Sequence, residues 1–145
     1  MKVLVQKVLS ASVTVENKVV AQIGSGFLLL VGVERGDTTD KADYLAKKVV
    51  NFRIFNDKND KMNLSLQDVD GEILAVSQFT LAADLSRGNR PGFDTAAAPQ
   101  EAEPLYEYFV QKLREYNIPV QTGIFQAYMQ VSLINDGPCT FILQK

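Results

Sequence analysis

The chain has 145 residues, of which 46% are hydrophobic, and that is enough apolar material for one domain with a core of its own. We therefore predict a single domain over residues 1–145. The formal net charge of −2 gives the chain as a whole no attraction for a polyanion. The longest apolar run, from Phe27 to Val33, is far shorter than the roughly 20 residues that span a membrane. We expect a cytoplasmic protein without membrane contact.

Two residue counts limit the chemistry that the protein can perform. It has no histidine and a single cysteine, Cys139, which excludes histidine-based zinc sites, catalytic triads and internal disulfides. We predict no metal and no cofactor. The general base of an enzyme with this sequence would be a carboxylate, a lysine, a hydroxyl group, the backbone acting through water, or the substrate itself.

The first part of the chain predicts strands followed by a helix. Hydrophobic residues with a period of two indicate strands around residues 3–5, 13–15 and 19–23, separated by turn residues at 16–18 and 24–26. The run from Phe27 to Val33 is typical of a strand that is buried on both faces. Capping residues near Asp37, with apolar side chains three and four residues apart, predict a helix up to about Asn51.

The second part predicts one more helix among further strands. A polar loop at 56–61 precedes an apolar strand at 73–76, whose carboxyl end leads into residues 77–81. Residues 84–99 form a long loop without periodicity, and such loops are usually functional or disordered. The remaining elements are a helix from Pro99 to about Asn117 and strands at 120–122 and 129–135. We predict an α+β fold with a mostly antiparallel, barrel-like sheet and two main helices.

Gly137-Pro138 interrupts the last strand pattern. Apolar segments precede and follow it, at 129–134 and 140–143. Proline has no N–H for a ladder, glycine weakens a strand, and the preceding Asn135 and Asp136 favour a turn. The pair therefore predicts a tight turn whose carbonyl oxygens face something other than a neighbouring strand. Its isomer is not decided by the residues, and by itself the turn has either a structural or a functional role.

Two motifs carry a resemblance to a known family. Residues 77–81, Ser-Gln-Phe-Thr-Leu, and residues 135–140, Asn-Asp-Gly-Pro-Cys-Thr, resemble the two signature motifs of the D-aminoacyl-tRNA deacylase family. Other landmarks follow in family order: Gln6-Lys7-Val8, Lys61-Met62-Asn63-Leu64-Ser65, Gly88-Asn89-Arg90-Pro91, Tyr106-Glu107-Tyr108-Phe109 and Thr122-Gly123-Ile124-Phe125. The resemblance thus covers nearly the whole chain.

The resemblance implies a homodimer that hydrolyses the ester of D-aminoacyl-tRNA, and of glycyl-tRNA mischarged on alanine tRNA. It implies that Gly137 and Pro138 of one subunit, in the cis form, enter the active site of the other. Their carbonyl oxygens would leave room for a hydrogen atom at the substrate α-carbon but not for an L side chain. Where Lys7 stands, the family usually has an arginine that braces these carbonyls, so Lys7 is the candidate support of the filter.

The candidate catalytic residues are Thr80 and Phe79. An aminoacyl ester is already activated, so positioning of water and stabilisation of the oxyanion matter more than a strong nucleophile. We expect the backbone N–H groups of Phe79 and Thr80 to stabilise the oxyanion, and the 2′-hydroxyl of the terminal adenosine to help activate water. Thr80 is alternatively a covalent nucleophile, although the sequence offers no evident base for it.

The candidate substrate-binding residues are Ser77, Gln78, Phe125 and Met129. An amide and an aromatic face suit a splayed-out base, so Gln78 and Phe79 are candidates for contacts with the terminal adenosine. Phe125 and Met129 either line the same pocket or belong to the core.

The sequence also departs from the family pattern, which generally has glycine at Gln126, serine at Gly92 and valine at Cys139. Gln126 either narrows the adenosine pocket or points outward. An alternative function is a noncatalytic RNA-end or nucleotide-binding module, and an alternative role of the Gly-Pro pair is dimer assembly alone. Arg87 and Arg90 are basic loop residues whose contact with RNA is open.

Overall fold

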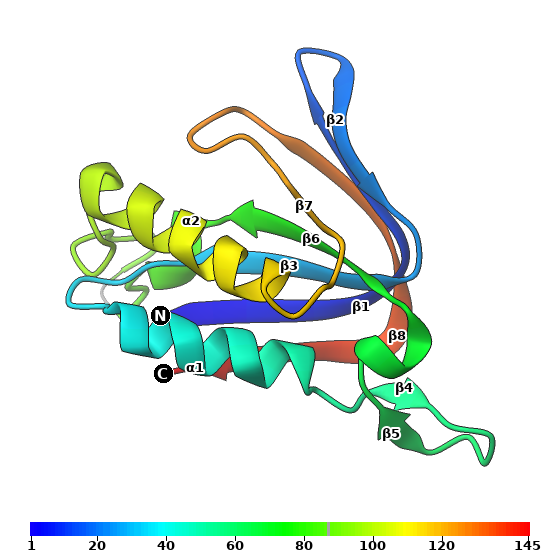
Figure 1. The fold of residues 1–145 in the computed structure, drawn as a ribbon. Coiled ribbons are helices and arrows are strands. Elements are labelled where there is room, and N and C mark those ends of the chain that lie inside the picture. Colours follow the sequence, from blue (N-terminus) through cyan, green and yellow to red (C-terminus); the bar gives the residue numbers. More distant parts are fainter. Residues whose placement is uncertain (87) are drawn as a thin grey trace.

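The computed structural model describes residues 1–86 and 88–145, and its central element is one long strand, β1 (Lys2–Val15). The sequence predicts two short strands in this region, but the structure has a single strand of 14 residues. β1 pairs antiparallel with β2 (Lys18–Ile23), with β3 (Gly26–Gly32) and with β8 (Gln130–Gln144) (Figure 1). It therefore connects all parts of the sheet.

Two parallel strands extend the sheet beyond β3. β6 (Glu72–Ser77) pairs with β3, and β7 (Val120–Thr122) pairs with β6. Parallel neighbours need a long crossover, and the two crossovers contain the helices α1 (Thr39–Val50) and α2 (Pro99–Arg114). The α+β class with two helices and mainly antiparallel pairing is confirmed, whereas the sequence does not predict the two parallel pairs.

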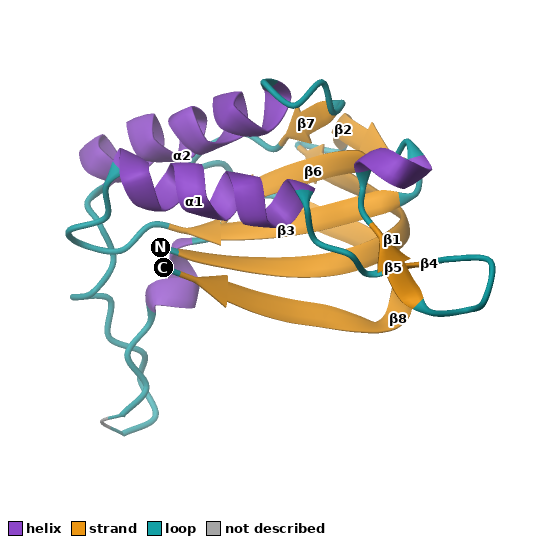
Figure 2. Cartoon of the chain, turned by 60° about the horizontal axis from the view of Figure 1, so that its bottom comes forward, coloured by secondary structure: helices purple, strands orange, loops and turns teal. Residues whose placement is uncertain are grey.

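Both helices cover the same face of the sheet (Figure 2). The residues of α1 that the spacing assigns to the core are buried: Ala42, Leu45, Ala46, Val49 and Val50. α2 begins with Pro99. Proline has no N–H, but the first N–H of a helix has no acceptor within the helix, so no hydrogen bond is lost at this position. The buried residues of α2 are Ala102, Tyr106, Phe109, Val110 and Leu113. They pack against β3, which is buried on both faces at nearly every position, as its apolar run predicts.

The opposite face of the sheet has a second, smaller core. Its buried residues are Val8, Ala11, Val13, Ala21, Ile23, Leu28, Leu74 and Val76. β2 and the adjoining halves of β1 and β8 bend over this face, and this gives the sheet its barrel-like shape (Figure 1).

The predicted tight turn at Gly137-Pro138 is wrong. The segments on either side belong to one strand, β8, and both pair with β1 in the same direction. Gln6 is opposite Thr140 and Val8 is opposite Asn135, so residues 136–139 are accommodated opposite Lys7 alone. This segment is a bulge, in which Gly137 and Pro138 have no ladder partner in β1 and are joined by a cis peptide bond.

The remaining elements are short. β4 (Phe55–Asn56) and β5 (Met62–Leu64) pair around the predicted polar loop. Residues 67–69 and 79–82 form the 3-10 turns η1 (Gln67–Val69) and η2 (Phe79–Ala82). Arg87, a basic residue considered for RNA contact, lies outside the described residues. Among the helices of the described chain, none has the length and apolarity needed to cross a membrane.

Candidate functional site

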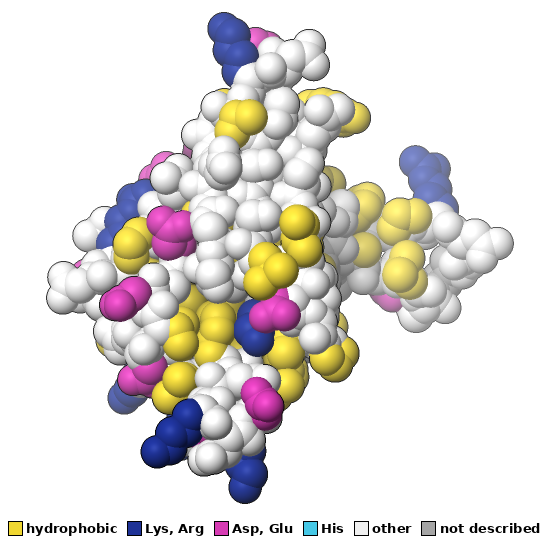
Figure 3. Space-filling model, turned by 90° about the vertical axis from the view of Figure 1, so that its right-hand side faces the viewer, with side chains coloured by type: hydrophobic (Ala, Val, Ile, Leu, Met, Phe, Trp, Pro, Cys, Tyr) yellow, Lys and Arg dark blue, Asp and Glu magenta, His cyan; other side chains and the backbone are white. Residues whose placement is uncertain are grey.

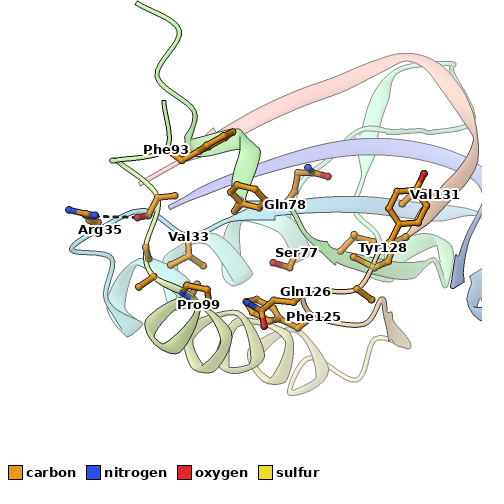
Figure 4. Close-up of a pocket in the computed structure, with 18 residues that line it drawn as sticks. Val33, Arg35, Ser77, Gln78, Phe93, Pro99, Phe125, Gln126, Tyr128 and Val131 are labelled. Atoms are coloured by element: carbon orange, nitrogen blue, oxygen red, sulfur yellow. Dashed lines mark hydrogen bonds between the residues drawn. The ribbon is translucent and has the colours of Figure 1, made fainter. Parts of the chain in front are cut away.

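A cavity of about 690 Å³ opens at the carboxyl end of β6 (Figure 4). Its volume lies within the roughly 300–1,000 Å³ of small-molecule sites. It is surrounded by the ends of β3 and β6, by η2, by the loop before α2 and the start of α2, and by the loop between β7 and β8 with the start of β8. The lining residues are Val33, Arg35, Val76, Ser77, Gln78, Phe79, Phe93, Ala96, Ala97, Ala98, Pro99, Ala102, Phe125, Gln126, Ala127, Tyr128, Met129 and Val131.

The cavity exists because β7 leaves β6 before β6 ends. Their last paired residues are Ala75 and Thr122, and the Ala75 carbonyl oxygen then accepts two further hydrogen bonds. The Gly123 N–H donates one at 3.1 Å and the buried Tyr106 hydroxyl donates the other at 2.9 Å. Burial raises the pKa of Tyr106, so its hydroxyl stays protonated as a donor. Beyond this point Ser77 faces open space instead of a neighbouring strand.

Five predicted site residues line this cavity. They are Ser77, Gln78, Phe79, Phe125 and Met129. Phe79 is 55% exposed and packs against Phe93, with ring centroids 5.0 Å apart. Phe125 packs against Tyr106, with centroids 6.1 Å apart, so this part of the cavity wall is attached to the helix layer. Phe79 and Phe125 therefore both line the cavity and pack against neighbouring aromatic side chains.

Thr80 is placed beside the cavity but is not among its lining residues. Its hydroxyl oxygen accepts a hydrogen bond of 2.5 Å from the Gln78 side-chain amide. The backbone N–H groups of Phe79 and Thr80 begin η2, and within the described residues neither has a backbone acceptor. Two adjacent donors without partners are therefore available for a ligand at the end of β6.

The bulge in β8 is supported by its own set of contacts. The Asn135 side-chain amide donates to the carbonyl oxygens of Lys7, at 2.9 Å, and Cys139, at 3.3 Å. The Lys7 ammonium lies 2.7 Å from the Asp136 carboxylate and 5.4 Å from the centroid of the Phe55 ring. The Lys7 side chain thus contacts the bulge, and the Asn135 side chain connects the two ends of the bulge to each other and to β1.

The side of the molecule where β8 bends is rich in hydrophobic side chains (Figure 3). Near the bulge, Leu9 is 55% exposed and Ile134 is 57% exposed. On the outer face of the same sheet, Ile142 is 69% exposed. Exposed apolar side chains of this size gain free energy when another surface covers them.

Within one chain, the bulge and the cavity are far apart. Lys7, opposite the bulge, is level with Phe27 and Ile73, whereas Ser77 is level with Val31. Four residues along a strand correspond to about 13 Å, and three strand spacings across the sheet to about 14 Å. Neither Gly137 nor Pro138 lines the cavity. The structure does not bring the two predicted parts of the site together in a single chain.

Comparison with known proteins identifies the family. The chain matches the family model described as D-Tyr-tRNA(Tyr) deacylase over residues 4–144. The chain belongs to this deacylase family. A relative from Geotalea uraniireducens, named D-aminoacyl-tRNA deacylase, is 61% identical over 99% of this chain and 93% of its own length. One of the same name from Pelobacter propionicus is 57% identical over 100% of both chains.

Two solved structures share the fold of this chain. A structure described as c-Myc DNA Unwinding Element Binding Protein has a TM-score of 0.95 and 40% identity, and covers 100% of this chain and 99% of its own. A probable eukaryotic D-amino acid tRNA deacylase has a TM-score of 0.79 over 98% of this chain and 97% of its own, and at 19% identity it shows the fold alone. The expected family and its class of reaction, ester hydrolysis, are confirmed.

Proposed function

We propose that this protein hydrolyses the ester bond of D-aminoacyl-tRNA, and of glycyl-tRNA mischarged on alanine tRNA, and so acts in the cytoplasm. Family membership supports the reaction. The observation that carries the proposal is the pair of N–H groups at Phe79 and Thr80, which have no acceptor within the described residues and lie beside a cavity in a chain without histidine. Such a site suits a substrate that is already activated and needs charge stabilisation more than a nucleophile.

In the proposed reaction, a water molecule attacks the carbonyl carbon of the ester, the bond from that carbon to the ribose 3′-oxygen then breaks, and the proton that the water loses passes to the departing oxygen. Negative charge develops on the carbonyl oxygen, and the N–H groups of Phe79 and Thr80 donate to it. The 2′-hydroxyl of the terminal ribose helps to activate the water, since no imidazole is present to do so. A substrate with a 2′-hydrogen should therefore be cleaved more slowly, and an unchanged rate would contradict the role of this hydroxyl.

Thr80 is assigned a positioning role in this mechanism. Its hydroxyl oxygen already accepts from the Gln78 amide, and it contributes its N–H through the backbone. Thr80→Ala keeps that N–H, so we expect kcat to fall by roughly tenfold or less, whereas loss of a covalent nucleophile typically costs on the order of 10⁴-fold or more. Single-turnover kinetics with D-tyrosyl-tRNA separate the two cases.

The selection for D-aminoacyl groups is proposed to come from a second copy of the chain. Gly137 and Pro138 are exposed on a bulge that is too distant to reach the cavity of their own chain. Their carbonyl oxygens, set beside the α-carbon of a substrate in the partner's cavity, would exclude an L side chain irrespective of its chemistry. The contacts of Asn135 and Lys7 stiffen the bulge, and the exposed apolar residues of β1 and β8 would be covered in the homodimer.

The chirality assay tests the reaction. Purified protein should release D-tyrosine from D-tyrosyl-tRNA and leave L-tyrosyl-tRNA intact. Equal hydrolysis of both substrates would overturn the filter, and hydrolysis of neither would overturn the enzymatic proposal. The second result would favour the noncatalytic RNA-end or nucleotide-binding module.

A mixed-dimer experiment tests the exchange between subunits. One chain carries a cavity variant, Phe79→Pro, which removes an oxyanion donor, and the other carries a bulge variant, Gly137→Val. The cavity-variant homodimer should be inactive, whereas the bulge-variant homodimer should hydrolyse L-tyrosyl-tRNA as well as D-tyrosyl-tRNA. In a mixed dimer the one intact cavity faces the one intact bulge, so that site should again reject the L substrate. Random mixing of equal amounts should therefore halve the hydrolysis of L-tyrosyl-tRNA per bulge-variant chain, because half of those chains then have a partner with an intact bulge. Undiminished hydrolysis of the L substrate in dimers shown to be mixed would overturn the cross-subunit site.

A milder bulge variant separates selection from assembly. A Cβ atom at Gly137 would lie 3.2 Å from the Asn135 side-chain oxygen, so Gly137→Ala is accommodated by a small shift. We expect the dimer to persist, as measured by analytical ultracentrifugation, while the ratio of D to L hydrolysis changes. A weakened dimer with an unchanged ratio would assign the Gly-Pro pair to assembly alone.

A further inference from the structure

Gln126 has an unusual backbone conformation for its residue type. It lies in a turn closed by the hydrogen bond from the Ala127 N–H to the Ile124 carbonyl oxygen, at 3.2 Å. Its φ of +60° at the third residue of this turn is the left-handed value that glycine adopts at least cost. A long side chain at such a position is destabilising relative to glycine. A residue kept there at a cost to stability is a candidate for a role in binding.

The location of Gln126 distinguishes it from the other residues with a positive φ. In the part of the chain that the structure describes, those other than glycine are Glu16, Asn17, Asp60, Asp70 and Asn117, in hairpin turns or after helices, and none of them lines the cavity. Gln126 does line it. In Figure 4 its side chain lies beside Phe125, near Pro99 at the start of α2.

Two other long polar side chains of the cavity each make one hydrogen bond to the protein. The Gln78 amide donates to the Thr80 hydroxyl, and the Arg35 Nε donates to the Ala96 carbonyl oxygen at 3.4 Å. For the Gln126 carboxamide, the described part of the chain provides no hydrogen-bond partner. Its donor and its acceptor both remain available to a ligand in the cavity.

The surroundings of this amide suit a flat aromatic ligand. Phe79, Phe93, Phe125 and Tyr128 line the cavity, and Tyr128 is 86% exposed at its edge. Aromatic faces stack on unpaired nucleobases, and a glutamine amide can pair with the adenine N6 and N7 atoms through its oxygen and its N–H.

We propose that Gln126 is a specificity-determining residue, whose carboxamide hydrogen-bonds to the edge of the adenine base of the 3′-terminal nucleoside. This inference rests on the proposed function, because it assumes that the ester-linked adenosine occupies the cavity. Gln126 acts in binding and not in the chemical step, so it controls KM and leaves kcat unchanged.

Binding of a non-hydrolysable ligand tests this assignment without relying on catalysis. The probe is 3′-deoxy-3′-(D-tyrosylamino)adenosine, and a second probe has 7-deazaadenine as its base. Gln126→Met keeps the length of the side chain and removes the amide, so its Kd for the first probe should rise about 5- to 100-fold. The wild type should prefer the first probe over the second, and Gln126→Met should bind both equally. Gln130→Met, on an exposed strand position outside the cavity, is the matched control.

Gln126→Gly gives an independent readout. It relieves the left-handed conformation and removes the amide, so its Tm should rise while its affinity for the first probe falls. A rise in Tm with unchanged affinity would overturn the inference, as would failure of the wild type to bind the probe. Gln126-dependent binding by a wild type that does not hydrolyse D-tyrosyl-tRNA would overturn the proposed function and leave the inference standing.

Discussion

The cavity at the end of β6 and the bulge in β8 are formed in different ways. The cavity is surrounded by several segments of chain, and beside it the Ala75 carbonyl oxygen accepts two hydrogen bonds that connect β6 to α2 and to the residue after β7. The bulge is formed within one strand, where residues 136–139 are accommodated opposite Lys7. Two N–H groups beside the cavity have no hydrogen-bond acceptor within the described residues, whereas Gly137 and Pro138 of the bulge are exposed. Under the proposed function, these two regions meet in a site assembled from two chains.

The largest expected effect is a loss of stability in the sheet that carries both regions. At Gly26, which lies in β3 beside β6, an added Cβ would lie 1.9 Å from the Glu72 carbonyl oxygen. Gly26→Ala should therefore separate the two strands and reduce the free energy of unfolding by more than about 3 kcal/mol, measured by urea denaturation. Gly24→Ala is the matched control, since its Cβ would have only an ordinary contact at 3.4 Å with the Glu72 side chain. Equal stability of the two variants would contradict this close approach.

Asn135→Ala should damage the bulge and spare the cavity. It removes two hydrogen bonds, to Lys7 and to Cys139, which together are worth about 1–3 kcal/mol. A looser bulge should discriminate less well, so we expect the D to L ratio of kcat/KM to fall by about tenfold or more, a change of roughly 1.4 kcal/mol. Ser132→Ala, at an exposed position of the same strand, should leave the ratio unchanged. Retained discrimination in Asn135→Ala would show that the bulge is held by other contacts.

Tyr106→Phe should loosen the cavity and spare the bulge. The variant loses one of the two donors to the Ala75 carbonyl oxygen and keeps the packing of the ring against Phe125. We expect a loss of about 1 kcal/mol in stability, because the Gly123 N–H still satisfies the carbonyl. KM for D-tyrosyl-tRNA should rise while the D to L ratio stays constant. A change in that ratio would mean that the two regions are not independent.

A smaller, pH-dependent effect should act on the stability of the whole domain through Asp37, which follows β3. Burial alone would raise the pKa of Asp37, but hydrogen bonds from the Met1 ammonium, the Glu34 N–H and Lys41 outweigh it, and the pKa lies below its usual value. A depressed pKa in the folded state stabilises the protein above the pKa of the unfolded side chain, about 4, and this stabilisation is lost as the pH falls further. Urea denaturation at pH 7 and pH 3 should show a smaller difference for Asp37→Asn than for the wild type. Glu107→Gln, on the exposed side of α2, should behave as the wild type does.

The sequence predicts those elements whose pattern is local. The spacing of Leu45 and Val49 identifies α1, and the unbroken run of β3 correctly predicts burial on both faces. Strand ends are also informative, since Ser77 and Phe79 were expected at the carboxyl end of a strand and do line a cavity there. In these cases the neighbouring residues along the chain contain the necessary information.

The features that the sequence does not predict depend on partners distant in the chain. The residues at Gly137-Pro138 are compatible with either a hairpin turn or a bulge. The two are distinguished only by the pairing of β1 with the segments before and after this pair. In the sequence, Tyr106 belongs to the apolar face of a helix. The role of its hydroxyl as a donor to the Ala75 carbonyl oxygen depends on a contact with a distant strand. Arg35, Phe93 and Tyr128 reach the cavity from three separate loops, and none of them belongs to a periodic pattern.

The distance between bulge and cavity in each chain has a genetic consequence under the proposed assembly. A copy with a damaged Gly137 would still offer a sound cavity, but it would deprive whichever neighbour it joined of selection. In a cell that makes normal and altered copies together, the harm would fall on the normal partner's substrate, and inheritance of the defect would be partially dominant.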